Sequence, residues 1–149
     1  MSGVSLSENQ QVVTLLLEYL NGLPSLPAPI LLEQFSDEFP ALMLQQLSGT
    51  VKIKQDILGG YTAQFPFAIY ARVVGNDTAS RILATGTLNN IGRELEQCTL
   101  SSALPVLGAG REATRIELRS FPNIISANED GTEDYQAVFM LEYTQKAIL

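Results

Sequence analysis

The sequence predicts an α+β domain with a mostly antiparallel, mixed sheet and helices packed on one face. Two segments place apolar residues at helical spacing, and several others alternate apolar and polar residues as strands do. Their order is helix, strands, helix, two strands, without the regular alternation typical of a parallel sheet. The 149 residues and the 46% hydrophobic content fit one domain over residues 1–149 with a single core.

The first predicted element is a helix over residues 8–21, after a segment, residues 1–7, that we expect to be flexible. Ser7 and Gln10 fit a capping box at its start, and an Asn-Gly pair ends its apolar pattern. The stretch LPSLPAPI that follows carries three prolines, so we expect an extended connector. A proline-motif ligand for an aromatic groove is the less favoured alternative.

Three strands are expected next. The stretches ALMLQQL and VKIKQDI predict two short strands, over residues 41–47 and 51–57. Gly59 and Gly60 then make the turn into a long strand over residues 61–74. The odd-numbered face of that strand is assigned to the core. It comprises Tyr61, Ala63, Phe65, Phe67, Ile69, Ala71 and Val73.

Pro66 lies in the middle of this long strand. Proline has no amide hydrogen to donate to a ladder, so we expect an edge strand or a bulge. At about 3.3 Å per residue the strand would extend about 45 Å, which a domain of this size is not expected to cover. Because uncovered edges invite pairing with other chains, we hypothesise a symmetric self-assembling protein.

The second half of the chain predicts a helix and two strands. Asn76 or Asp77 can cap a helix over residues 78–97, followed by a surface loop over residues 98–112. The stretches EATRIELRSFPNII and TEDYQAVFMLEY predict the last two strands. Asp130 and Gly131 form a hairpin turn signal between them.

Composition narrows the function. The net charge of -7 argues against a protein that holds nucleic acid by neutralising phosphates. The absence of histidine excludes hydrolysis through an imidazole base and the common histidine-containing zinc sites. The single cysteine, Cys98, has no internal disulfide partner, and no apolar stretch approaches the roughly 20 residues that span a bilayer. We therefore expect a soluble, intracellularly made protein that is not an enzyme, has no cofactor and has no membrane partner.

Four acids cluster around the turn before the last strand. They are Glu129, Asp130, Glu133 and Asp134. Aligning Gly131 with the glycine of an EF-hand loop puts Ala137 where a bidentate glutamate is needed, so a calcium loop is disfavoured. A solvated hairpin tip is the preferred interpretation, with a subunit or partner contact second and a metal site last.

The six arginines outnumber the three lysines. Arginine suits bidentate contacts with carboxylates, so some of the set is expected to pair across a subunit interface, while intrachain and surface pairs account for most of it. The candidate interface residues are Gly59, Gly60, Gln64, Pro66, Arg72, Arg81, Arg111, Glu129, Asp130, Glu133 and Asp134.

Two long stretches together resemble a known family. They are LGGYTAQFPFAIYARVVGNDTASRILATGTLNNIGRELE and IELRSFPNIISANEDGTEDYQAVFMLEY. The glycine pair before PFAIY, the NDTASR helix start, the LNNIG helix centre and the EDGTEDYQA strand entry resemble minor capsid or tail terminator proteins of long-tailed phages and prophages of Gram-positive bacteria. The resemblance covers about residues 10–145.

The resemblance implies a structural virion protein. Such a subunit forms a ring, commonly a hexamer, at the head-proximal end of the tail tube, where it ends tube polymerisation and joins the tail to the head connector. The implied partners are further copies of the chain, the tail tube protein and a head-completion or connector protein. DNA would pass through the ring without specific binding, which a negative chain favours. Assembly would occur in the host cytoplasm.

Two other functions stay open at this stage. One is a head-tail adaptor or another connector ring, or another minor capsid protein. The other is an enzyme or ligand-binding module that uses the carboxylates of residues 128–134, for which the sequence offers no nucleophile or histidine.

Overall fold

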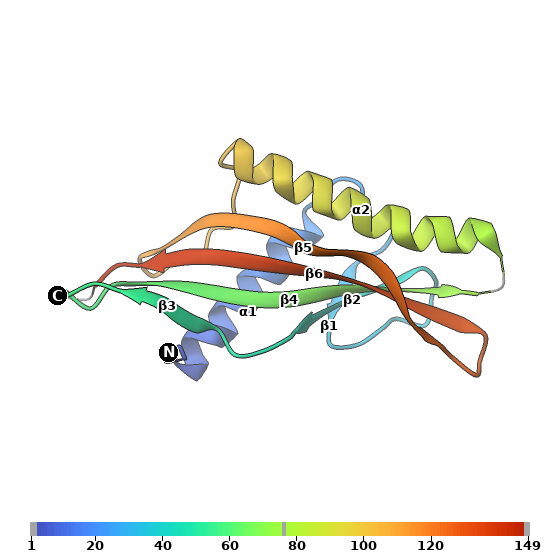
Figure 1. Ribbon diagram of the computed structural model, residues 1–149, viewed down its shortest axis with the longest axis horizontal. Coiled ribbons are helices and arrows are strands. Elements are labelled where there is room, and N and C mark those ends of the chain that lie inside the picture. Colours follow the sequence, from blue (N-terminus) through green and yellow to red (C-terminus); the bar gives the residue numbers. More distant parts are fainter. Residues whose placement is uncertain (1–2, 76, 148–149) are drawn as a thin grey trace.

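In the computed structural model, residues 3–75 and 77–147 are described and form a six-stranded mixed sheet with two helices (Figure 1). The elements are α1 Leu6–Asn21, β1 Ile30–Leu32, β2 Ala41–Gln46, β3 Val51–Gln55, β4 Tyr61–Val74, α2 Thr78–Leu100, β5 Arg111–Ala127 and β6 Thr132–Gln145. The strand order is β1-β2-β4-β6-β5, and β3 pairs with β4. Only β1 and β2 pair in parallel; the other pairs are antiparallel, so the predicted fold class is confirmed.

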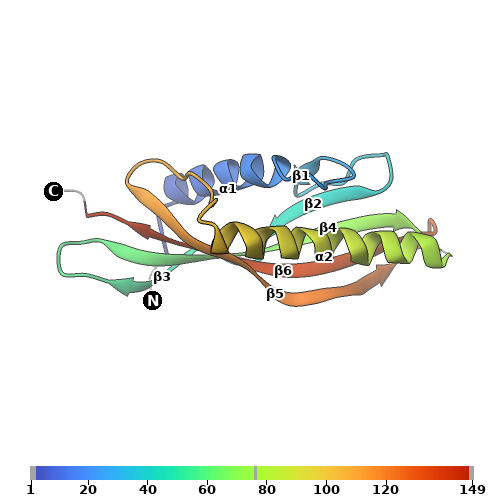
Figure 2. The same ribbon diagram turned by 90° about the horizontal axis from the view of Figure 1, so that it is seen from above.

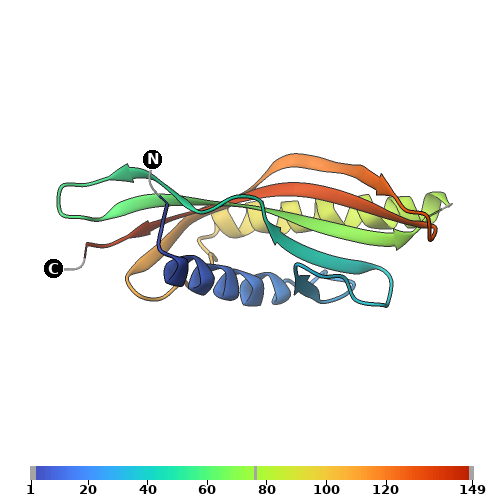
Figure 3. The same cartoon turned by 90° about the horizontal axis from the view of Figure 1, so that it is seen from below.

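Both helices contribute to one hydrophobic core on one face of the sheet. Figure 2 shows α2 running along β4, β6 and β5, and buried residues of α1 belong to the same core cluster. The face of β4 that the sequence assigns to the core lies in this core cluster from Ala63 to Val73, and Tyr61 packs against its margin. The opposite face of β4, β5 and β6 carries no helix in the described chain, as Figure 3 shows from below.

The start of α1 differs from the prediction. Ser5, not Ser7, is the N-cap: its Oγ accepts a hydrogen bond from the backbone N of Glu8, 3.1 Å away. Gly3 forms a β-bridge with Val51, and α1 begins at Leu6, so part of the segment over residues 1–7 has regular structure. Met1 and Ser2 lie outside the described residues.

β4 is a central strand, which corrects the prediction for Pro66. β6 pairs with β4 along its whole length, while β3 and β2 share its other side, opposite residues 61–64 and 67–72. Pro66 lies between those two partners, and its carbonyl accepts a hydrogen bond from the backbone N of Leu47 at 3.1 Å. Because the N–H and C=O of a strand residue point to the same side, the missing amide faces this gap and not β6.

Other boundaries also move. β1 was not predicted; the side chain of Asn21 positions it, with Oδ1 accepting from the backbone N of Ile30 at 2.7 Å. Asp77 caps α2 by accepting from the backbone N of Ser80 at 2.6 Å, and the alternative cap, Asn76, lies outside the described residues. α2 continues to Leu100 and β5 begins at Arg111, so the predicted loop over 98–112 is reduced to residues 101–110.

Candidate interaction surface

The longest edge strand of the sheet in the described chain is β5. In the described chain this 17-residue strand pairs only with β6, and its register shifts at several points. It contains its own proline, Pro122, so the association of proline with an edge strand applies here rather than to Pro66. Proline and irregular register both disfavour a continuous ladder with another chain. A partner at this edge would therefore bind chiefly to side chains.

The distal half of β5 exposes large apolar side chains. Phe121 is 80% exposed, and Ile124 and Ile125 are each 47% exposed. We call these three residues, with the turn acids Glu129 and Asp130, the β5 edge patch. Exposed apolar groups that lie close together, with polar groups beside them, are typical of protein interaction sites.

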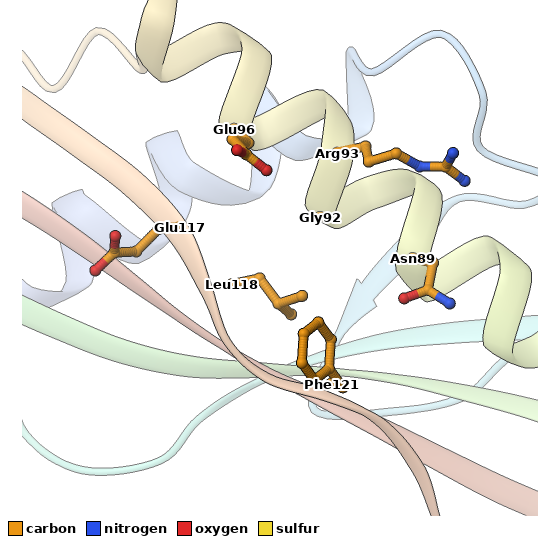
Figure 4. Close-up of a pocket in the computed structure, with 7 residues that line it drawn as sticks. All are labelled: Asn89, Gly92, Arg93, Glu96, Glu117, Leu118 and Phe121. Carbon is orange, nitrogen blue, oxygen red and sulfur yellow. The ribbon is translucent and has the colours of Figure 1, made fainter.

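A groove of about 640 Å³ runs between α2 and β5 beside this patch (Figure 4). Its lining residues are Asn89, Gly92, Arg93, Glu96, Glu117, Leu118 and Phe121. Figure 4 shows Leu118 and Phe121 on the β5 side of the groove, facing α2. A Cβ added at Gly92 would lie 3.3 Å from Cδ2 of Leu118, so glycine allows the close approach of α2 to β5.

The charged groups of β5 mostly bind one another. Glu117 forms a 2.9 Å ion pair with Nε of Arg119 and a 3.9 Å ion pair with Nε of Arg115. Nη2 of Arg115 lies 3.4 Å from Oε1 of Glu142 on β6. In the described chain, Glu96 at the groove rim has no ion-pair partner. The groove therefore combines an apolar wall with one unpaired carboxylate.

Four of the predicted interface residues pair within the chain. Arg72 binds Asp134 through two hydrogen bonds of 2.7 and 2.9 Å, and Arg81 binds Glu133 through two of 3.1 and 3.2 Å. These contacts raise the pKa of both guanidinium groups. Arg72 also lies 4.1 Å from the ring centroid of Phe35.

The hairpin tip is only partly solvated, which corrects the prediction for its four acids. Glu129 and Asp130 are exposed, whereas Glu133 and Asp134 are buried by their arginine partners and the sheet. Hydrogen bonds from the side chain and backbone of Thr132 lower the pKa of Asp130. In the described residues, no group of three or more cysteine, aspartate or glutamate side chains is placed to hold a metal ion.

The remaining candidates do not form one site with these acids. Gly59, with a φ of 98°, and Gly60 form the tip of the β3–β4 hairpin, at the opposite end of the molecule from Glu129 (Figures 1 and 2). Gln64, on the face without helices, donates a 3.2 Å hydrogen bond to Glu142. Arg111, at the start of β5, donates a 3.0 Å hydrogen bond to Gln11.

The β3–β4 hairpin adds residues that sequence reasoning missed. Ile57 is fully exposed and Leu58 is 65% exposed, directly before the turn glycines. The sequence does carry a signal for this surface: two apolar residues lie at a hairpin tip, where polar residues are usual. Phe121 and Ile124 were likewise assigned to a strand but not to a surface.

Comparisons with known proteins leave the family open. No family model matches the chain, and no curated protein matches its sequence significantly. Neither helix in the described part of the chain has the length and apolar character that a bilayer-crossing segment needs.

Proposed function

We propose that this chain is a structural virion protein: a tail terminator that assembles as a ring, expected to be a hexamer, at the head-proximal end of a phage tail tube. There it ends tube polymerisation and offers a surface to a head-completion or connector protein. The observation that carries the proposal is the β5 edge patch, where Phe121 is 80% exposed on an edge strand that pairs with β6 on one side only in the described chain. The sequence resemblance supports the same role.

Charge supports the passage of DNA through such a ring. The chain has a net charge of -7, and Arg72, Arg81, Arg115 and Arg119 are neutralised by carboxylates of the same chain. The excess of acidic over basic side chains disfavours phosphate binding, so a ring of these subunits would let DNA slide without holding it.

Tube assembly in vitro tests the proposal. The purified chain is mixed with the tail tube protein of the same virus, and tube lengths are measured by negative-stain electron microscopy. We expect capped tubes and a narrow length distribution, with rings of the chain at one end. An unaltered length distribution would overturn the terminator role.

A variant at the β5 edge patch tests the role of this surface in capping. Phe121→Asp replaces an exposed side chain, so circular dichroism and thermal unfolding should match those of the unmodified chain. Tubes grown with Phe121→Asp should be uncapped and long. A ring that binds the head connector but leaves tube length unchanged would instead identify a head-tail adaptor.

A further inference from the structure

We propose that the β3–β4 hairpin of one copy docks on the β5 edge patch of the next copy. This inference rests on the self-assembly proposed above. The occupant of the patch is thus a second copy of this chain. The hairpin lies at one end of the long axis of the subunit, and the patch extends from Phe121, level with the middle of β4, to the β5–β6 turn at the opposite end (Figures 1 and 2). A contact between two different surfaces is heterologous, and such contacts generate rings when the rotation closes.

The apolar contact comes from side chains without cover in their own subunit. At the hairpin, Ile57 is fully exposed, and Leu58 and Ile53 are also exposed. On the patch, Phe121 and Ile124 are exposed, and Phe121 lines the α2–β5 groove. Docking the first set on the second removes both from water, which is the main driving force of association.

The charge distribution favours a contact between two different ends of the subunit. All three lysines of the chain, Lys52, Lys54 and Lys146, lie at the hairpin end, and none forms a salt bridge in the described part of its own subunit. The acids closest to these lysines in sequence or register are Asp56 and Glu112, which bring the net charge of this end near zero. The Asp56 carboxylate already accepts hydrogen bonds from the backbone N–H groups of Leu58 and Gly60.

The opposite end is acidic. Asp77, Glu129 and Asp130 are exposed there, and none of them is in a salt bridge within the described residues. Two acidic ends would repel each other, whereas an acidic end facing the lysines is attracted. Charge therefore favours head-to-tail contacts over a symmetric contact between two β5 edges.

The two surfaces offer matching groups. Leu58 and Ile125 are exposed apolar side chains, and Lys54 and Glu129 are exposed groups of opposite charge. In this docking Leu58 packs on Ile125 while Lys54 faces Glu129.

A charge exchange tests this docking on rings formed at the tube end. Lys54→Glu and Glu129→Lys each place like charges opposite one another, so each should reduce the fraction of capped tubes by about tenfold or more. The combination of Lys54→Glu with Glu129→Lys should restore capping. Glu18→Lys, on the exposed face of α1, is the matched control and should leave capping unchanged.

Disulfide trapping gives a second measurement. In a Cys98→Ser background, Leu58→Cys with Ile125→Cys should give a covalent ladder of oligomers on oxidation, whereas each single cysteine should give no ladder. Capped tubes that persist in both charge variants, without a ladder, would overturn the docking but leave the terminator role intact. The absence of caps and rings from the unmodified chain would overturn both.

Discussion

The hydroxyl of Tyr143, near the end of β6, donates a 2.6 Å hydrogen bond to Oε2 of Glu8, in the first turn of α1. Tyr61 of β4 donates to the other oxygen of the same carboxylate. Glu8 and Tyr143 are buried, and burial together with these hydrogen bonds raises the pKa of both tyrosines. A carboxylate in the helix thus ties α1 to two strands of the sheet.

Glu8→Ala should therefore destabilise the fold. The substitution leaves two hydroxyl groups without their acceptor, at a cost of roughly 2–4 kcal/mol in the free energy of unfolding. Glu8→Gln keeps one carbonyl acceptor and should cost less. The measurement is urea unfolding followed by circular dichroism, with Glu18→Ala on the exposed face of the same helix as the control. Equal stability of Glu8→Ala and Glu18→Ala would contradict this role.

Alkaline pH should weaken the fold through Tyr143. Its raised pKa means that, above the ordinary tyrosine pKa of about 10, the unfolded chain loses a proton that the folded chain keeps. The contribution is complete below that pH and falls by about 1.4 kcal/mol per pH unit above it. Urea unfolding from pH 9 to 11 should show a shallower decline for Tyr143→Phe. Phe67→Leu, which weakens the core without removing a tyrosine, should keep the slope of the unmodified chain.

Periodicity predicted the faces of the strands but not their partners. The alternation in β4 correctly assigned residues such as Phe65 and Phe67 to the core, because burial on one face imposes a period of two. The central position of β4 depends on β6, which follows about sixty residues later and pairs with its whole length. A missing amide at Pro66 fits an edge or a gap between two partners, and only the long-range pairing distinguishes them.

The sequence predicted the kinds of contact that the candidate interface residues make, but not where in the fold those residues lie. The preference of arginine for bidentate carboxylate contacts was correct, yet the β4–β6 register places Arg72 opposite Asp134 within one chain. Phe121 lies in a segment that is apolar enough for a core strand. Its exposure follows from the edge position of β5, which depends on the order of strands in the sheet.

The Arg72–Asp134 pair should contribute to stability. Asp134 also accepts a 3.3 Å hydrogen bond from Asn128, so Asp134→Asn loses a charged acceptor in a buried position. We expect a loss of about 1–3 kcal/mol, measured by urea unfolding. Glu129→Lys, in the exposed turn between β5 and β6, should leave the unfolding midpoint unchanged. A midpoint for Asp134→Asn that equals that of the unmodified chain would show that the pair adds no stability.

Phe65→Asp should prevent folding. Phe65 is 0% exposed, and its ring centroid lies 6.1 Å from that of Phe67, which stacks on Phe139. A buried carboxylate without a partner costs more than the net stability of an ordinary domain can offset. Phe65→Ala, which leaves a cavity instead, should fold with a loss of about 3–5 kcal/mol. Circular dichroism and thermal unfolding measure both, with Thr62→Asp on the opposite face of β4 as the control; a soluble, folded Phe65→Asp would refute the assignment of this face to the core.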